Sequence, residues 1–452
     1  MTLPRSFIHS IQNTRGFNQE AFEEIHSLGK QITSIRINPS KSFESSLIPP
    51  LGSGGGIAWS EQGYYLATRP SFTFDPLFHA GCYYVQEASS MFLEQALKQT
   101  VDLSKPLKVL DLCAAPGGKS THIQSIISED SLLVSNEVIR SRAKILKDNI
   151  IKWGCENVVV TNNDPKDFAK LENYFDVIVV DAPCSGSGLF RREPESIKEW
   201  SENNVQLCSQ RQQRILADVL PALKEGGLLV YSTCSYSKEE DEDIVDWLVN
   251  ECSMLKTQLS LSNVWGIIES GGGYRFWPDK VRGEGFFLAC FQKKNGGDSR
   301  TIKAKKKPIL LTKIEIAMLM KWVELDDKVF IKHENTVYAW PAKWVDEFSF
   351  LLEHLRLVYS GVLVGELMRD KLIPDHALAM SKIYNHSLPN VSFSKQEAIM
   401  YLQRKDLYPQ TDKKGWCLAS FEGNNLGWMN ILQGRMNNYY PKSLRILKES
   451  PE

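Results

Sequence analysis

Between residues 106 and 294, short apolar and β-branched runs alternate with longer helical patterns, and this alternation limits the possible fold more than any other feature. Six runs are strand candidates: residues 108–112, 131–137, 157–164, 175–183, 226–235 and 286–292. Runs that are apolar throughout, rather than at every second residue, are typical of strands covered on both faces. The pattern therefore predicts a doubly wound α/β domain with a mainly parallel sheet.

The flanking regions have different patterns, and 452 residues favour two or three domains. Residues 1–105 combine a helical pattern, two strand candidates around a Gly-rich turn, and a second helical pattern at 83–99, which indicates an α+β accessory region. Residues 295–308 are polar, basic and Gly-containing, as in a linker. In residues 309–452, helical patterns precede Gly- and Trp-rich strands at 415–421 and 424–432. We expect a small mixed domain there with a partly closed β-barrel.

Composition excludes some classes of protein. The net charge of −1 shows no global basic character, so any site for a polyanion must be local. The nine cysteines are scattered, with no CxxC pair or zinc spacing, which favours reduced thiols and no metal site. The first residues lack the apolar core of a secretory signal, and no run approaches the ~20 apolar residues of a membrane helix. We expect a cytoplasmic protein that does not enter membranes.

The motif "DLCAAPGGKS" follows the first strand candidate and leads into a helical pattern. Its alanines and glycines are small, so a ligand can approach the backbone amides at the start of that helix. It matches neither the GxxxxGK[ST] phosphate loop nor GxGxxG. A phosphate cradle is therefore disfavoured, whereas the carboxylate of an amino-acid ligand can still use these amides.

Acidic residues end four successive strand candidates: Asp111, Glu137, Asp164 and Asp181. An acid about 20 residues beyond such a glycine loop typically binds ribose hydroxyls, which fits Glu137, and Asp164 can accept a hydrogen bond from an adenine amino group. Any one of these acids could equally be a turn or helix cap. The whole set, without a phosphate loop, favours S-adenosylmethionine, whose cationic sulfonium tolerates nearby carboxylates.

Two cysteines follow neighbouring strand candidates: Cys184 in "DAPCSG" and Cys234 in "STCSY". Most cysteines at such positions are small buried hydrophobic residues. Here, however, Pro183 stiffens the chain before Cys184, and Cys234 precedes a helical pattern whose N-terminus would favour a thiolate. Adjacent strands should bring both sulfurs to one cleft.

Pyrimidine chemistry gives such a pair of thiols a use. Carbon 5 of a pyrimidine is a poor nucleophile, but a thiolate that adds at carbon 6 makes an enamine able to attack a sulfonium methyl group. The reaction also needs a proton donor at the ring and a later base. The two thiols, Asp181 and Lys119 can supply these functions.

Four motifs, "DLCAAPGGKS", "NE" before an Arg-containing helix, "DAPCSGSGLFRREPE" and "YSTCSYSKEEDE", resemble in order and spacing those of the Nop/Sun family of RNA 5-methylcytosine methyltransferases. The resemblance covers residues 60–294 and implies a Rossmann-like, S-adenosylmethionine-dependent methyltransferase domain. It implies that Cys234 is the covalent nucleophile, that Cys184 assists release of the product, and that Asp181 also hydrogen-bonds the cytosine. The cofactor-binding residues it implies are Cys113, Ala114, Ala115, Pro116, Gly117, Gly118, Lys119, Glu137, Asp164 and Asp181.

The C-terminal segments "SGVLVGELMRDKLIPDHALAMS" and "GWMNILQGRMNNYYPKSLR" are similar to the bacterial RsmF-type branch of that family. This implies a small-subunit ribosomal RNA substrate and a PUA-like RNA-binding domain at the end of residues 309–452, with residues 1–105 as a second RNA-binding region. Ser187, Asp241 and Asp279 depart from residues common in the family. None of these departures removes a thiol or a cofactor acid.

Contacts with RNA phosphates must come from local cations because the net charge is close to zero. The candidates are Arg191 and Arg192 beside the Cys184 loop, Lys442 and Arg445 near the C-terminus, Arg140, Arg142 and the lysines at 303–307. For any single cation, a solvated surface charge is the simpler interpretation. Trp416, Trp428 and Tyr440 could stack on bases, but core packing fits so small a domain better.

Three other functions stay open at this point. The substrate could be transfer RNA, the chain could be a ribosome-assembly factor that binds RNA without turnover, or it could methylate a small molecule or a protein side chain. The last two would leave the thiols without a role. We expect a monomer, and the sequence specifies neither the modified nucleotide nor whether free RNA or an assembled particle is the substrate.

Overall fold

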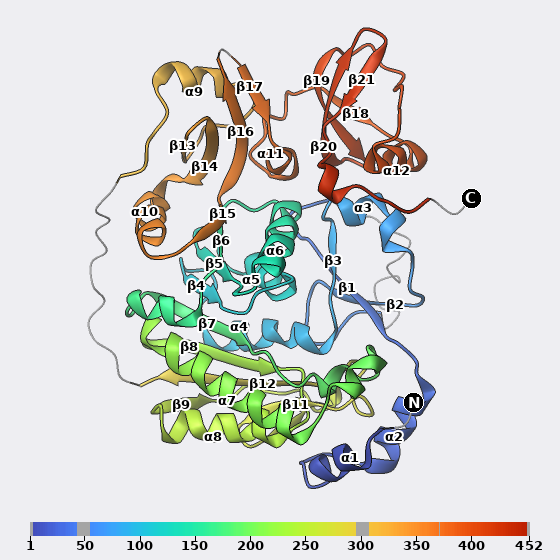
Figure 1. Cartoon of the computed structure of the whole chain (residues 1–452), viewed down its shortest axis with the longest axis vertical. Coiled ribbons are helices and arrows are strands. Elements are labelled where there is room, and N and C mark those ends of the chain that lie inside the picture. Colours follow the sequence, from blue (N-terminus) through green and yellow to red (C-terminus); the bar gives the residue numbers. More distant parts are fainter. Residues whose placement is uncertain (1–2, 43–54, 295–306, 370, 450–452) are drawn as a thin grey trace.

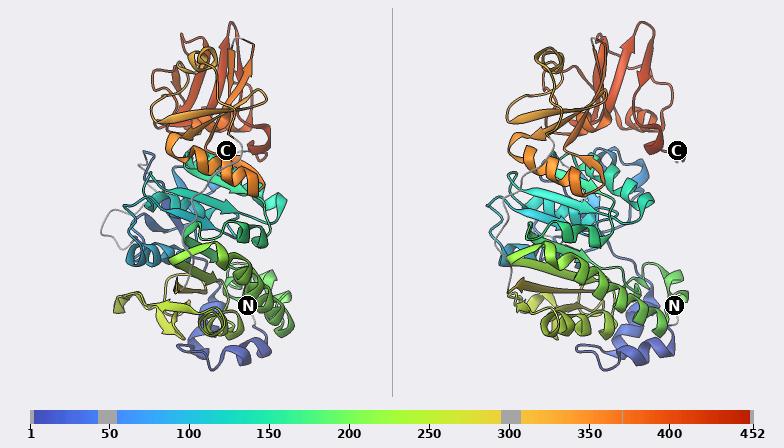
Figure 2. Two further views of the ribbon diagram at one scale, coloured as in Figure 1. Left: turned by 90° about the vertical axis from the view of Figure 1, so that its left-hand side faces the viewer. Right: turned by 60° about the vertical axis from the view of Figure 1, so that its left-hand side comes forward.

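The computed structural model describes residues 3–42, 55–294, 307–369 and 371–449 (Figure 1). Most of the expected linker at 295–308, the lysines at 303–306 and part of the Gly-rich turn before residue 56 lie outside these ranges. Figure 2 shows that the C-terminal elements stack at one end of the molecule and the first two helices lie at the other, with a large sheet between them.

The large sheet has ten strands in the order β10-β11-β12-β8-β7-β4-β5-β6-β15, with β9 paired to β12. Its six predicted strands are β4 (Lys108–Asp111), β5 (Leu132–Asn136), β6 (Val158–Thr161), β7 (Phe175–Asp181), β8 (Leu223–Thr233) and β12 (Phe286–Lys293). The first five are parallel, and β12 is antiparallel to β8. The chain runs outward from β4 to β6 and then returns to β7 beside β4. The strand order therefore reverses between β4 and β7, and in such sheets ligands bind at the carboxyl ends near this point.

Helices cover both faces of the sheet, which explains why the strands are apolar throughout. In β7, Val177 and Val179 belong to one hydrophobic cluster, whereas Ile178 and Val180 belong to a second cluster on the opposite face. The first cluster includes side chains from α4 (Leu93–Thr100), α5 (Gly118–Ile126) and α6 (Arg140–Trp153), and the second includes α7 (Glu202–Val219), α8 (Glu242–Asn250) and α10 (Val345–His354). The predicted doubly wound α/β fold is confirmed.

Four strands of this sheet were not predicted: β9 (Met254–Thr257), β10 (Ile268–Ser270), β11 (Gly273–Phe276) and β15 (Leu357–Ser360). The first three extend the antiparallel side next to β12. The strand β15 comes from the C-terminal region and pairs antiparallel with β6, with Leu357 opposite Thr161. The sheet therefore continues beyond the boundary expected at residue 294.

The N-terminal region contains α1 (Arg5–Ile11), α2 (Gln19–Leu28), α3 (Pro76–His79) and the antiparallel sheet β2 (Gly63–Leu66), β1 (Thr33–Ile37), β3 (Tyr83–Val85). The helix predicted from residue 83 is wrong in its first part, because these residues pair with β1 as a strand. Phe7 and Phe22 pack with Phe190 and Tyr236 of the large domain. The first two helices are thus anchored to the segments that follow β7 and β8.

The C-terminal region forms two four-stranded sheets rather than the partly closed barrel we expected. One contains β13 (Lys328–His333), β14 (Thr336–Pro341), β16 (Val362–Met368) and β17 (Lys371–Pro374), and the other β18 (Asn390–Ser392), β19 (Gly415–Phe421), β20 (Asn424–Leu432) and β21 (Arg435–Asn438). The remaining helices are α9 (Lys313–Leu319), α11 (His376–Met380) and α12 (Lys395–Gln403). Among the described residues no pairing joins β18 to β21, so the second sheet stays open.

Trp428 and Tyr440 are buried in hydrophobic clusters, which confirms their interpretation as core residues.

Candidate active site

The two thiols lie against each other at the carboxyl ends of β7 and β8. These strands are parallel neighbours, with Asp181 opposite Ser232, and Cys184 and Cys234 come just after their last residues. The two Sγ atoms are 3.1 Å apart, and both cysteines are free and partly exposed. A disulfide would need about 2 Å, so the contact is a hydrogen bond between thiols. The prediction that both sulfurs reach one site is confirmed.

The hydrogen bond between the thiols affects the pKa of Cys184. The bond to Cys234, together with burial, holds the pKa of Cys184 well above its ordinary value. Cys184 is therefore the thiol that keeps its proton, and a protonated Cys184 can donate to the sulfur of Cys234. The helix N-terminus predicted after Cys234 does not lie beside the thiol in the sequence, because α8 begins only at Glu242, after a short 3-10 turn (η7, Lys238–Glu240).

A charged pair lies beside the thiols. Lys119 Nζ is 2.7 Å from Asp181 Oδ2, and the Ser232 hydroxyl donates a 2.8 Å hydrogen bond to the other oxygen, Oδ1. Burial by itself lowers the pKa of Lys119, but the adjacent Asp181 outweighs it and leaves that pKa raised. Lys119 therefore stays protonated and acts as a hydrogen-bond donor rather than as a base, while Asp181 accepts hydrogen bonds from Lys119 and Ser232.

The loop between β4 and α5 is held from both sides. The amide of Ala114 donates to Asn136 O, and side chains of α6 donate to the carbonyls of Ala115 and Pro116, each at 2.8 Å. Gly117, at φ 116°, precedes the first residue of α5 in a conformation that residues with a side chain rarely adopt. Burial raises the pKa of the Cys113 thiol in this loop, so it is not a reactive group.

The surroundings of the Asp111 carboxylate test whether this loop fits S-adenosylmethionine. Its side chain is fully buried; Ser120 donates to Oδ2 at 2.7 Å, while Oδ1 has no partner. Burial raises the pKa of Asp111 to about 7. A buried carboxylate oxygen without a partner needs an explanation, and a cation such as the ammonium group of S-adenosylmethionine would satisfy it. The residues present therefore fit this cofactor.

The two outer acids combine local roles with their place at the strand ends. Glu137 is buried, and its Oε1 accepts a 2.8 Å hydrogen bond from the amide of Ile139. Asp164 accepts from the amide of Lys166 and caps a short 3-10 helix. The interpretation of Asp164 as a cap is thus correct, and it does not exclude a second role toward a ligand.

Comparisons with known proteins support the same assignment. The family model of 16S rRNA methyltransferase RsmB/F matches residues 98–292, the RsmF N-terminal domain matches 3–88, and the RsmF PUA domain matches 388–446. Ribosomal RNA small subunit methyltransferase F of Salmonella paratyphi A is 30% identical, over 91% of this chain and 90% of its own. The chain belongs to the RsmB/F methyltransferase family.

Other relatives agree with this assignment. The enzyme of the same name from Shewanella piezotolerans is 28% identical over 91% of this chain and 90% of its own. A crystal structure of a methyltransferase homolog from Pyrococcus horikoshii is 28% identical, covers 64% of this chain and all of its own (100%), and superimposes with a TM-score of 0.51. As an RsmB/F family member the chain is an S-adenosylmethionine-dependent methyltransferase, and formation of 5-methylcytosine is the reaction of the family.

One predicted RNA contact of this RsmB/F family member is wrong. Only 2% of the Arg191 side chain is exposed, and it pairs with Glu284 at 3.0 Å and donates to Gly283 O at 2.6 Å. A buried, paired guanidinium cannot reach a phosphate on a bound RNA. Arg192 is exposed, but the acids Glu193, Glu195 and Glu199 follow it on the same surface segment.

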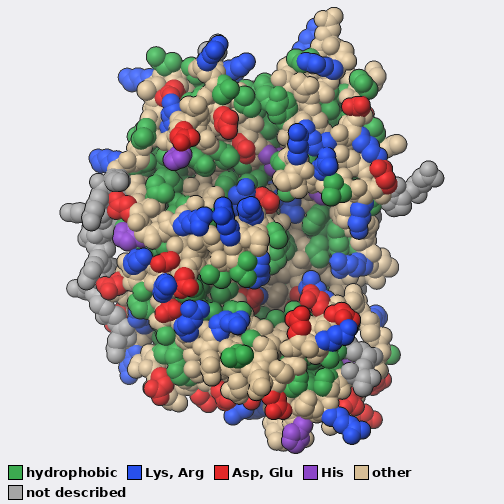
Figure 3. Space-filling view, viewed as in Figure 1, with side chains coloured by type: hydrophobic (Ala, Val, Ile, Leu, Met, Phe, Trp, Pro, Cys, Tyr) green, Lys and Arg blue, Asp and Glu red, His purple; other side chains and the backbone are tan. Residues whose placement is uncertain are grey.

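The other predicted RNA contacts are distributed elsewhere. Lys442 and Arg445 are exposed near the C-terminus, far along the chain from the thiols. Arg142 donates to Ala115 O and so supports the cofactor loop, and its role toward RNA stays a prediction. In the space-filling view the face is hollowed near its centre, and Lys and Arg side chains gather above the hollow, over α6 (Figure 3).

One residue of this site, Glu240, was not predicted from the sequence. Glu240 is fully buried and hydrogen-bonds Ser185 and Ser235, the residues next to the two thiols. In the sequence it stands in the run "KEEDED", which looks like the polar start of a helix, so only its spacing of six residues from Cys234 could have marked it.

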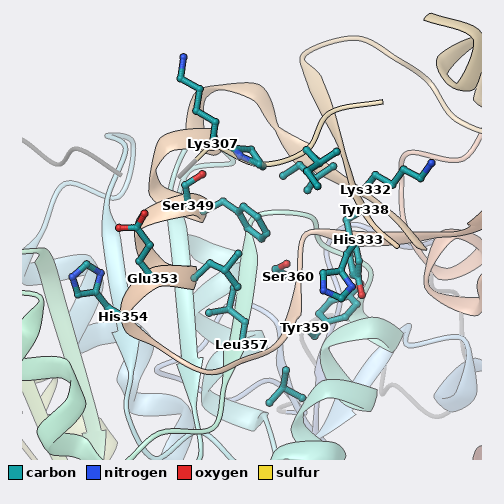
Figure 4. A pocket seen from close by; sticks show the side chains of 16 residues that line it. Lys307, Lys332, His333, Tyr338, Ser349, Glu353, His354, Leu357, Tyr359 and Ser360 are labelled. Carbon is teal, nitrogen blue, oxygen red and sulfur yellow. The ribbon is translucent and has the colours of Figure 1, made fainter. Parts of the chain in front are cut away.

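A second cavity lies apart from this site. It has a volume of about 850 Å³ and lies between β13, α10 and β15, lined by Phe348, Leu357, Tyr359 and other side chains (Figure 4). Of the predicted site residues, only Lys307, one of the candidate RNA contacts, lines it; the predicted catalytic and cofactor-binding residues do not. In the part of the chain that the structure describes, no cluster of His, Cys, Asp and Glu suits a metal ion, and no helix is both long and apolar enough to cross a membrane.

Proposed function

We propose that this enzyme transfers a methyl group to carbon 5 of a cytosine in small-subunit ribosomal RNA, with Cys234 as the covalent nucleophile. The observation that carries the proposal is the pair of hydrogen-bonded thiols beside the Lys119–Asp181 pair, at the point where the strand order reverses. The choice of ribosomal RNA follows the names of the relatives. Asp111, Glu137, Asp164 and the 113–119 loop would hold S-adenosylmethionine, which supplies an electrophilic methyl group.

The chemistry proceeds by addition and elimination. The Cys234 thiolate forms a bond to carbon 6, the ring electrons move to carbon 5, and protonated Lys119 together with Asp181 stabilises the ring through hydrogen bonds. After methylation, a base takes the proton from carbon 5, the bond between Cys234 and carbon 6 breaks, and the electron pair returns to sulfur. The Cys184 thiol, 3.1 Å from that sulfur, donates a hydrogen bond to the departing thiolate.

A methyl-transfer assay tests the nucleophile. Wild-type protein and Cys234→Ala are incubated with small-subunit ribosomal RNA and S-adenosylmethionine labelled on the methyl group, and the variant should fall to background because it lacks the sulfur that adds to carbon 6. Cys252→Ala, a partly exposed thiol outside the pair, is the matched control and should keep its activity. Full transfer by Cys234→Ala would exclude this mechanism.

A second variant tests release. Cys184→Ala should form a covalent RNA–protein adduct that persists in a denaturing gel, because the departing thiolate loses its hydrogen-bond donor while the attacking thiol remains. Loss of turnover without any adduct would assign Cys184 a different role.

The substrate is tested separately. Ribosomal RNA, small-subunit particles and transfer RNA are offered in parallel, and bisulfite mapping of ribosomal RNA from a strain without the gene locates the modified position. We expect transfer to small-subunit RNA; transfer only to transfer RNA, or RNA binding without any turnover, would support one of the other functions instead.

We also propose that residues 1–105 and 309–452 hold the RNA on either side of the methyltransferase domain, with Lys442 and Arg445 among the phosphate contacts. Both side chains are exposed, which supports this role. A monomer acting in the cytoplasm remains a prediction, and sedimentation of the purified protein tests the first part of it.

A further inference from the structure

Glu240 connects the two segments that carry the thiols. Its Oε1 accepts a hydrogen bond from the amide of Ser185 at 2.8 Å, and its Oε2 accepts from the hydroxyl of the same serine at 2.5 Å. Oε2 also accepts from the Ser235 hydroxyl at 2.7 Å. Ser185 directly follows Cys184, and Ser235 directly follows Cys234. One carboxylate therefore binds the immediate neighbours of both thiols.

The contacts of Glu240 continue into α7. Gln212 donates to Glu240 Oε1 at 3.3 Å and to Pro183 O at 3.1 Å, and Pro183 directly precedes Cys184. Tyr231 of β8 donates to the backbone carbonyl of Glu240 at 2.6 Å. The Cys184 loop is thus held at the residues before and after the thiol, by groups fixed to a helix and a strand.

The Glu240 side chain lies in the interior of the protein rather than on its surface. Glu240 is fully buried, and burial raises its pKa despite four hydrogen bonds to its carboxylate. A buried carboxylate is stabilised only when its partners are well placed, and removing it leaves their donors unsatisfied. Here those donors belong to the two loops of the catalytic pair.

We propose that Glu240 is a positioning residue that sets the separation of Cys184 and Cys234 by clamping their two loops to one carboxylate. This deepens the proposed function and rests on it for its catalytic meaning. Glu240 itself does not contact substrate. Its role is to keep the Cys184 thiol within hydrogen-bonding distance of Cys234 when the latter leaves the product.

The separation of the thiols can be measured without RNA. In a glutathione buffer, the thiols of Cys184 and Cys234 reduce glutathione disulfide to two glutathione thiols and become a disulfide, and the equilibrium constant reports the effective concentration of one thiol near the other. Peptide mass spectrometry identifies the 184–234 link among the other cysteines. We expect Glu240→Ala to lower this constant by at least about tenfold, because the loops lose their shared anchor.

Two further variants separate the clamp from general stability. Glu240→Gln keeps an acceptor for the Ser185 amide and offers an amide donor to the two hydroxyls, so the constant should stay within about threefold of wild type. Glu94→Ala is the matched control: this carboxylate is also buried, but it binds Ser60, Lys98 and His122 instead of the thiol loops. It should lower the melting temperature without changing the constant. If Glu240→Ala does not fold, Glu240→Asp, whose shorter side chain cannot reach both serines, replaces it.

The methylation assay then links the clamp to catalysis. Glu240→Ala should lower kcat about tenfold or more and prolong the life of the RNA adduct, while KM for S-adenosylmethionine stays unchanged because Asp111, Glu137 and Asp164 lie at the ends of other strands. An unchanged disulfide constant in both Glu240→Ala and Glu240→Asp would overturn the clamp whatever the substrate. A lowered constant in an enzyme whose wild type methylates no RNA would uphold the clamp and overturn only the proposed function.

Discussion

Single side chains at this site acquire their properties from residues far away in the sequence. Cys184 is held protonated by Cys234, which lies 50 residues further on, and Lys119 is held charged by Asp181. Asp111 is the opposite case, because burial without a cationic partner at Oδ1 raises its pKa to about 7. Cys184 and Lys119 are therefore already protonated before the substrate binds, whereas Asp111 lacks a cationic partner until a ligand supplies one.

This difference predicts a pH-dependent affinity for the cofactor. Below about pH 7 Asp111 is protonated in the free protein, so a cation that binds there must displace its proton. We expect S-adenosylmethionine to bind more tightly as the pH rises from 6 to 8, with proton release at the lower pH, measured by calorimetry in buffers of different ionisation enthalpy. Asp111→Asn should remove this dependence and weaken binding about tenfold at pH 8.

The control for this experiment is Asp102→Asn, which changes an exposed acid in the turn before β4. It should keep the wild-type profile. If the wild type releases no proton when the cofactor binds at pH 6, the cofactor does not bind at Asp111.

At the scale of elements, a strand from the C-terminal region supports the cofactor side of the sheet. The backbone of Arg356, directly before β15, accepts a hydrogen bond from the Asn162 amide at 3.0 Å and donates to Asn163 Oδ1 at 2.9 Å. Both asparagines directly precede Asp164, the acid expected near the adenine. The segment before β15 therefore holds the loop that carries Asp164.

Disrupting β15 should weaken cofactor binding from outside the domain boundary expected from the sequence. Tyr359→Pro places a proline in the middle of this strand, opposite Val160, where it cannot donate to the strand ladder. We expect the dissociation constant of S-adenosylmethionine to rise about fivefold or more, measured by calorimetry.

Asn437→Pro, in the edge strand β21 far from this sheet, is the matched control. It should lower the melting temperature but leave cofactor affinity unchanged. Equal loss of cofactor affinity in both variants would indicate general destabilisation rather than support of the Asp164 loop.

Across the whole molecule, charge is divided between surfaces rather than shared evenly. Lys and Arg gather over α6 on the face with the central hollow (Figure 3). The exposed segment after Arg192, by contrast, is rich in glutamate. Lys442 and Arg445 are exposed at the end of the C-terminal region. RNA, as a polyanion, should lie over the cations and avoid the segment beside Arg192.

Charge reversal tests this path. The double variant Lys442→Glu and Arg445→Glu should weaken RNA binding and lower the slope of log affinity against log salt by about 1 to 2, because each lost phosphate contact removes roughly 0.7 to 0.9. Filter binding at several salt concentrations measures it, and cofactor affinity should not change. Arg192→Glu is the control variant and should weaken RNA binding less than the double variant. If it weakens RNA binding more, the RNA lies over the segment beside Arg192 instead.

What the sequence by itself determined is local or repeats along the chain. The six apolar runs become strands because a strand buried on both faces must be apolar at every position, and Asp181, Cys184 and Cys234 meet because parallel strands share a carboxyl edge. Only the tertiary structure decided that Arg191 is buried against Glu284, that residues 83–85 form a strand, that β15 joins the large sheet and that Glu240 holds both thiol loops. Each of these features depends on a partner distant in the sequence or on the burial of a charge. Neither cause produces a repeating pattern of residue types from which it could be predicted.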